Sequence, residues 1–221
     1  MPTQNSSLAT EQLKTLSSPR RPYGLLSRLL FLSMDLLYGR RRTLSKFKVL
    51  EIIARVPYQA WEHVAYIAMT HTHSQPHFAR RIFDFVQESR HQQDNEQWHL
   101  LLLEELVQRK GIRESYLFAR VLPQFMAFAY YHISWLLYVL RPSWSYALNA
   151  DFEDHAEHEY MEFVRENPSL ETEPFVSDFT ADYGNFANLA DLFRQIGLDE
   201  RLHKEQSLAR IDNPRFPGPM A

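Results

Sequence analysis

The pattern Glu-x-x-His occurs in two apolar, helix-forming stretches of this chain, and it restricts how the chain can fold. One copy lies in "NEQWHLLLL" and the other in "LDERLHKE". Residues three apart share one face of an α-helix. Glu96 with His99, and Glu200 with His203, can therefore each direct two ligand atoms toward one centre. Taken alone, such a pair is most often a solvated helix face.

A third pair with the same spacing, Glu88 and His91, lies about two helical turns before Glu96 and His99. By helical phase it points about 80° away from them round the helix. Only one of these two pairs can face a given core, so spacing alone does not identify the functional one.

Composition narrows the classes of protein and of site. A chain of 221 residues with 14% aromatic residues and only 6 glycines favours a single domain of long helices. A net charge of -3 gives no reason to expect a nucleic-acid partner. The chain has no cysteine, which excludes disulfides and thiolate ligands, so any metal must be held by histidine and carboxylate.

Hydrophobic periodicity, prolines and glycines predict a succession of helices. The first 20 residues are polar and read as a flexible arm, without the apolar core of a signal peptide or the length of a transit sequence, which suggests a bacterial protein. We expect one helical domain over 21–211 and a tail over 212–221. The expected helices cover 23–39, 44–74 with a kink at Pro57, 76–110, 114–140, 145–167 and 185–209.

Four glutamates fall at one level when residues are counted up and down successive helices. They are Glu51, Glu96, Glu153 and Glu200. With His99 and His203, this is the pattern of a carboxylate-bridged pair of metal ions, in which two helices give one glutamate each and two give Glu-x-x-His. Four carboxylates in one core need cations to offset their charge.

Oxygen donors with two imidazoles suit two iron ions, with manganese as the main rival. Asn95 and Asp199 each precede a ligand glutamate and are expected to orient the ligand histidines. The predicted fold is thus all-α: a ferritin-like four-helix bundle with a di-iron centre, plus two additional apolar membrane-facing helices at 23–39 and 114–140. A dimer interface or a core face is the alternative role for those two helices.

Four motifs in order resemble the alternative oxidase family, and most closely its plastid terminal oxidase (plastoquinol oxidase) branch. "VLEIIARVPY" is similar to that branch's "VLETIARVPY", "NEQWHL" to NE-x-x-HL, "FEDHAEHEY" to "VESHAYSTY", and "LDERLH" to DE-x-x-H. The resemblance spans roughly 34–208. It implies that the four glutamates and two histidines above are the iron ligands, whereas Glu88 and His91 match nothing in the family.

The resemblance also implies roles for further residues. Tyr160, seven residues after Glu153, corresponds to a tyrosine proposed as a redox partner of the metals. A quinol pocket is implied at Lys46, Leu50 and Ala156. Two positions depart from the family pattern, since Lys46 stands where arginine is usual and Glu159 where a small hydroxyl residue is usual.

The reaction implied is oxidation of two quinols, with plastoquinol favoured, coupled to reduction of one dioxygen to two waters. The resemblance further implies a monotopic, membrane-bound homodimer that pumps no protons, on a bacterial cytoplasmic or thylakoid-type membrane. A second hypothesis is a di-iron hydroxylase acting on a quinone-like or lipid substrate. A third is a helical membrane-surface scaffold without a metal.

Overall fold

The computed structural model describes residues 3–213, 215 and 216, and all regular structure in this part of the chain is helical. This confirms the all-α prediction. A π-helical turn, Leu117–Val121, leads into α6, and a 3-10 turn, Pro168–Glu171, follows α7. The α-helices are α1 (Thr3–Ser17), α2 (Leu25–Tyr38), α3 (Leu44–Ala54), α4 (Val56–Thr72), α5 (Pro76–Arg109), α6 (Leu122–Leu140), α7 (Pro142–Glu166) and α8 (Leu189–Ala209).

Local chemistry explains where several helices begin and end. The Thr43 side chain accepts a hydrogen bond from the Lys46 amide at 3.2 Å and so caps the start of α3. The interruption expected near Pro57 falls at Arg55, between α3 and α4, because proline has no N–H to donate to the preceding turn. Gly111, with φ of 62°, ends α5 as predicted.

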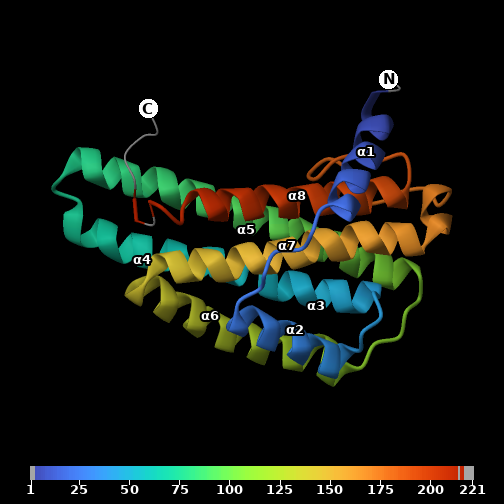
Figure 1. Cartoon of the computed structure of the whole chain (residues 1–221), viewed down its shortest axis with the longest axis horizontal. Coiled ribbons are helices and arrows are strands. Elements are labelled where there is room, and N and C mark those ends of the chain that lie inside the picture. The colour runs from blue at the N-terminus through green and yellow to red at the C-terminus, as the bar shows by residue number, and fades with distance from the viewer. Residues whose placement is uncertain (1–2, 214, 217–221) are drawn as a thin grey trace.

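Long helices run side by side through the molecule (Figure 1), with α3 and α4 following one another along one line. Helix α7 packs mainly on α8, and α5 packs on α3 and α4. Helix α6 packs on α4 and α7 at the lower edge of Figure 1, where α2 also lies against α7. The helices that carry the predicted ligands are therefore neighbours.

Two aromatic-rich clusters of buried side chains flank the level of the predicted ligands. On α3 and α4, Glu51 falls between Phe47 of one cluster and Tyr58 of the other. On α7, Glu153 falls between Tyr146 and Tyr160 in the same way. The carboxylates thus form a polar layer with apolar packing on both sides.

Residues 3–17 differ from the flexible arm that the sequence led us to expect. They form α1, which packs on α7 and α8. Gln12 and Thr15 are buried there, and the Gln12 amide donates to the Met161 carbonyl at 2.9 Å. The prediction of a flexible arm was wrong because it rested on polar composition alone. These polar side chains form hydrogen bonds with other helices.

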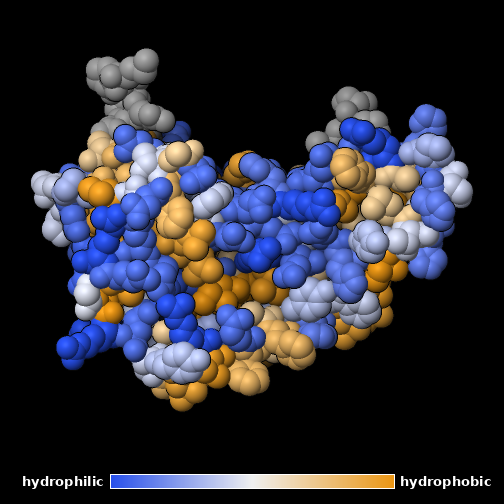
Figure 2. All heavy atoms as spheres, turned by 180° about the vertical axis from the view of Figure 1, so that it is seen from behind, coloured by the Kyte–Doolittle hydropathy of each residue, from blue (hydrophilic) through white to orange (hydrophobic). Residues whose placement is uncertain are grey.

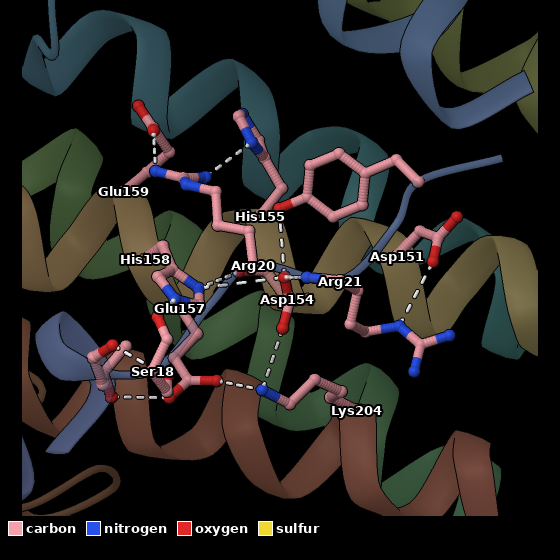
Figure 3. Close-up of polar contacts among 12 residues, drawn as sticks. Ser18, Arg20, Arg21, Asp151, Asp154, His155, Glu157, His158, Glu159 and Lys204 are labelled. Carbon is pink, nitrogen blue, oxygen red and sulfur yellow. Dashed lines mark hydrogen bonds and ion pairs between the residues drawn. The ribbon is translucent and has the colours of Figure 1, made fainter. Parts of the chain in front are cut away.

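The segment after α1 is also tied to α7 by charged side chains (Figure 3). The Arg20 guanidinium bonds Glu159 at 2.8 Å and lies 3.1 Å from the His155 ring. Asp154 accepts from the Arg21 amide at 3.0 Å and from Lys204 at 3.1 Å. Glu159, unusual for the family resemblance, therefore has cationic partners here.

The final helix begins later than predicted. It starts at Leu189 instead of Asn185, because the Asn188 side chain accepts from the Asp191 amide at 2.9 Å and caps it there. Residues 185–188 remain in the connector. Of the predicted tail, residue 214 and residues 217–221 lie outside the described part of the chain.

Over the described residues, none of the helices combines the length and apolar character that crossing a membrane requires.

Candidate metal centre

Four helix segments bring the six predicted ligands together in the buried interior. Glu51 comes from α3 and Glu153 from α7. Helix α5 supplies Glu96 and His99, and α8 supplies Glu200 and His203. All six side chains are buried, although none of these residue types is usually found inside a protein without a partner.

Their ligand atoms form two overlapping groups, each with all atoms within 4.8 Å of one another. Glu96 and Glu200 belong to both groups, which is the arrangement that bridging carboxylates require. Glu51 and His99 complete one group, and Glu153 and His203 complete the other. The set can hold two metal ions side by side.

The distances between these groups are short for buried charges. His99 Nδ1 lies 3.2 Å from Glu200 Oε1 and 3.4 Å from Glu51 Oε2. His203 Nδ1 lies 2.6 Å from Glu96 Oε1.

Several atoms that face the centre make no hydrogen bond among the described residues. They are both carboxylate oxygens of Glu96 and Glu200, Oε2 of Glu51 and Glu153, and Nδ1 of His99 and His203. A buried acceptor without a donor is costly, and several around one point are more so. Two divalent cations would satisfy all of these lone pairs at once, so the residues fit the metal pair.

The protonation behaviour of the ligands reflects the same crowding. Burial and the charge of Glu200 raise the pKa of Glu51 well above its usual value. Burial, Glu200 and Glu96 do the same to the pKa of Glu153. Burial alone lowers the pKa of His203, but Glu96 and Glu200 raise it to about 10 overall. Metal-free, the centre holds protons that metal ions would displace.

His99 is oriented by a carboxylate on its far side, as predicted for Asp199. Its Nε2 lies 3.2 Å from Asp199 Oδ2, which leaves Nδ1 directed at the centre. Asn95 donates to Asp199 Oδ2 at 3.4 Å, so it supports Asp199 instead of contacting a histidine directly.

Tyr183 completes this arrangement and was missed in the sequence. Its hydroxyl donates to Asp199 Oδ2 at 2.6 Å and lies 3.2 Å from His99 Nε2. It comes from the connector between α7 and α8, where no periodicity marks it. A cavity of about 370 Å³ opens beside these residues, lined by Asp199, Tyr183 and Trp98 among others.

Tyr160 lies where the resemblance placed it, next to the centre. Its hydroxyl donates to Glu51 Oε1, and its ring stacks on Phe47 with centroids 4.4 Å apart. A second tyrosine, Tyr58, was missed: its hydroxyl donates to Glu153 Oε1 at 2.6 Å. Tyr58 follows Glu51 by seven residues, and that spacing was a signal available in the sequence.

The three residues of the expected quinol pocket lie on the side of the centre that faces α2 and α6. Leu50 and Ala156 are buried in one cluster with Met34 of α2. The Lys46 ammonium bonds Asp35 at 2.6 Å and the Gly39 carbonyl at 2.9 Å. Leu50 directly precedes Glu51 in the chain, and Ala156 follows Glu153 by three residues.

Glu88 and His91 lie away from the centre. Glu88 pairs with Arg210, and His91 is exposed. Helical phase therefore separated the two Glu-x-x-His pairs of α5 correctly.

Comparisons with known proteins agree with this geometry. Residues 20–209 match the model of the alternative oxidase family. The chain is 36% identical over 132 residues to "Ubiquinol oxidase 4, chloroplastic/chromoplastic" of Arabidopsis thaliana, and the alignment covers 60% of this chain. It spans about a third (34%) of that relative's length. Together with the buried glutamates and histidines, the match over 20–209 shows that the chain belongs to the alternative oxidase family, a family of di-iron carboxylate proteins.

Proposed function

We propose that the protein is a quinol oxidase that couples oxidation of two quinols to reduction of one dioxygen to two waters. The observation that carries the proposal is the buried set of glutamates and histidines at the positions of the family motifs. Each quinol gives two electrons and two protons, so two quinols balance one dioxygen. The printed name of the Arabidopsis relative, a ubiquinol oxidase, supports the same class of substrate.

We assign Glu51, Glu96, His99, Glu153, Glu200 and His203 as the ligands of two iron ions in a ferritin-like four-helix bundle. When bound, the iron pair supplies the one-electron steps that reduction of dioxygen requires. The protein's part is to exclude water, because both apolar clusters cover the polar layer. Asp199 fixes the His99 ring so that Nδ1 stays directed inward.

Tyr160 is our candidate for a redox-active side chain. Its hydroxyl proton already lies on a hydrogen bond to Glu51 Oε1. If the phenol gives one electron toward dioxygen, the oxidant of the proposed reaction, its proton would pass along this bond to Glu51 Oε1. Burial and the nearby charge of Glu51 raise the pKa of Tyr160 well above its usual value, so the phenol is protonated before that step.

Quinol is proposed to reach the centre from the side of α2 and α6, past Lys46, Leu50 and Ala156. Leu50 directly precedes Glu51, which places the apolar cluster of α2 and α6 next to a ligand. Lys46 can offer a donor to a quinol oxygen, although its ammonium is bonded to Asp35. Plastoquinol is the favoured donor.

The same side of the molecule carries an exposed apolar surface, which supports monotopic membrane binding. Apolar side chains gather along the lower edge in Figure 2, where α2 and α6 lie. Arg28, Arg40 and Arg41 are exposed beside it and suit anionic lipid headgroups. The exposed apolar side chains of this surface are Leu25, Leu29, Leu32, Leu36, Phe125, Phe128, Leu136 and Leu140. We call this set the apolar face.

A bacterial cytoplasmic or thylakoid-type membrane is the proposed location, and a homodimer the proposed assembly. Tyr66 and Ile67 of α4 and Phe83 of α5 are exposed outside the apolar face and are available for self-association.

An oxygen electrode tests the activity directly. Iron-loaded protein in liposomes should consume one dioxygen for every two quinols, with plastoquinol and ubiquinol analogues compared side by side. Glu153→Ala should abolish the activity and keep vesicle binding, whereas Glu88→Ala, outside the centre, should retain both. With ¹⁸O-labelled dioxygen, an oxidase should place both labelled atoms in water and none in the organic product, whereas label in the organic product would show a hydroxylase.

A further inference from the structure

Two tyrosines occupy equivalent positions relative to the two glutamates that stand alone on their helices. Tyr58 follows Glu51 by seven residues, and Tyr160 follows Glu153 by seven residues. Seven residues make about two helical turns and a rise of about 10 Å. Neither tyrosine therefore reaches the glutamate seven residues before it in the chain.

Each tyrosine instead bonds the other of the two glutamates. The line of α3 and α4 runs opposite in direction to α7 (Figure 1). Tyr160 donates to Glu51 Oε1, and Tyr58 donates to Glu153 Oε1 at 2.6 Å. In both glutamates Oε2 makes no hydrogen bond among the described residues, and each of the two glutamates belongs to one ligand group.

The centre thus has an approximate twofold relation that pairs its two halves. Glu96 and His99 of α5 correspond to Glu200 and His203 of α8. Tyr58 is the counterpart of Tyr160 under this relation. The half formed with Glu153 and His203 therefore has its own tyrosine.

The surroundings of the two hydroxyls differ. Tyr160 stacks on Phe47 and Phe193, with ring centroids 4.4 and 6.2 Å away. The Tyr58 hydroxyl accepts a hydrogen bond from Asn149 Nδ2 at 3.0 Å, and that amide also donates to Ser207 at 3.1 Å. Since Asn149 occupies a lone pair of the hydroxyl, the proton of Tyr58 is directed onto Glu153.

Tyr58 also contacts the histidine of the same half. Its ring lies edge-on to His203, with centroids 5.6 Å apart. Tyr58 thus contacts both the glutamate and the histidine that complete this half of the centre.

We propose that Tyr58 is a positioning residue of the metal centre, which fixes Glu153 so that Oε2 faces the second metal position. The inference rests on the metal assignment in the proposed function, but not on the quinol reaction. The proposal predicts that the two metal positions can be weakened independently, because Glu153 is held by Tyr58 and Glu51 by Tyr160.

Cobalt(II) titration of the full, metal-free chain tests this, with visible absorption reporting the coordination of each ion. We expect wild-type protein to bind two Co²⁺ per chain. Tyr58→Phe should bind one of the two about 10–100-fold more weakly and change its absorption bands, the loss typical when a ligand's supporting hydrogen bond is removed. Tyr146→Phe is the matched control: it removes a buried hydroxyl of α7 that bonds Tyr138 instead of a ligand, and should titrate like wild type.

Asn149→Ala provides a second variant should Tyr58→Phe fail to fold. It removes the donor to the Tyr58 hydroxyl and should weaken the same Co²⁺ position, to a smaller extent. Unchanged affinities and spectra in a folded Tyr58→Phe or Asn149→Ala protein would overturn the proposal. If wild type binds two Co²⁺ and Tyr58→Phe weakens one, but the iron-loaded protein oxidises no quinol, the proposed function fails while the role of Tyr58 stands.

Discussion

Asp199 shows how one residue outside the ligand set controls a ligand. Its carboxylate accepts hydrogen bonds from Tyr183, Asn95 and Gln195. It also contacts Nε2 of His99, the ring nitrogen that faces away from the centre. Burial opposes its ionisation, but His99 and Tyr183 outweigh burial and hold the pKa of Asp199 below its usual value. A carboxylate in this position fixes the ring orientation and increases the basicity of the ligand nitrogen.

Asp199→Asn should therefore weaken metal binding by about 10–100-fold without unfolding the protein, because the amide retains the shape of the side chain but loses its charge. Competition with a coloured chelator measures the affinity, and circular dichroism checks the fold. Asp84→Asn is the control, since Asp84 is exposed and pairs only with Arg80. Equal affinities in wild type and Asp199→Asn would contradict this role.

Metal loading should become stronger as pH rises. Glu96 and Glu200 raise the pKa of His203 to about 10 despite its burial, and burial raises the pKa of Glu51. A pKa of about 10 keeps His203 protonated in the metal-free protein at neutral pH, and that proton must leave before His203 can bind a cation. Each proton released increases the association constant about tenfold per pH unit below the group's pKa. Co²⁺ titrations at pH 6 and pH 8 measure this; equal affinities would show that no proton is displaced.

Among the elements, α1 is the helix whose role is least evident from composition. Arg194 Nε donates to Gln12 at 2.9 Å, and Thr15 donates to Glu157 at 2.6 Å. Arg201 adds bonds to Thr15 at 2.6 Å and to Glu157 at 2.9 Å. Helix α1 thus adds polar partners to buried charged groups that also pair among themselves, such as Glu157 with Lys204 and Arg194 with Asp191.

Gln12→Ala should lower the free energy of unfolding by about 1–3 kcal/mol, because it leaves the buried Arg194 Nε without its acceptor and removes the bond to the Met161 carbonyl. For a chain of this size that is a fall in Tm of roughly 2–12 °C. Thermal unfolding followed by circular dichroism measures it. Gln97→Ala, on the exposed face of α5, is the control and should leave Tm unchanged. A Tm equal to wild type in Gln12→Ala would mean that α1 contributes no stability.

For the whole molecule, the apolar face of α2 and α6 and the buried centre are connected. The cluster containing Leu50 and Ala156 lies between them, with Met34 of α2 and Tyr130 of α6 in the same packing. A lipid-soluble substrate could thus pass from a membrane surface to the centre without crossing water. Both features fit the proposed oxidation of a lipid-soluble quinol.

Leu29→Ser combined with Phe125→Ser should reduce binding to anionic vesicles at least about tenfold, since burying each apolar side chain contributes roughly 1.5–3 kcal/mol. Sedimentation with vesicles measures the bound fraction. Metal content should not change, because both residues are exposed. Leu202→Ser is the matched control, as it is exposed on α8 away from the apolar face. Unchanged sedimentation of the double variant would show that membranes bind elsewhere.

Helical periodicity is a local property, and it was enough to predict the all-α class and most helix boundaries. The candidate ligands needed more than Glu-x-x-His spacing: counting residues along successive helices brought the four glutamates to one level, and the family motifs separated Glu96 and His99 from Glu88 and His91. The Tyr58 bond to Glu153 joins residues 95 apart in the chain, and the Tyr183 bond to Asp199 joins the connector to α8 across 16 residues. Only the tertiary structure decided these partners, and with them the docking of α1. All of these contacts have the same physical reason. The role of a buried polar side chain depends on which distant group it contacts, and residue spacing along one helix carries no information about that group.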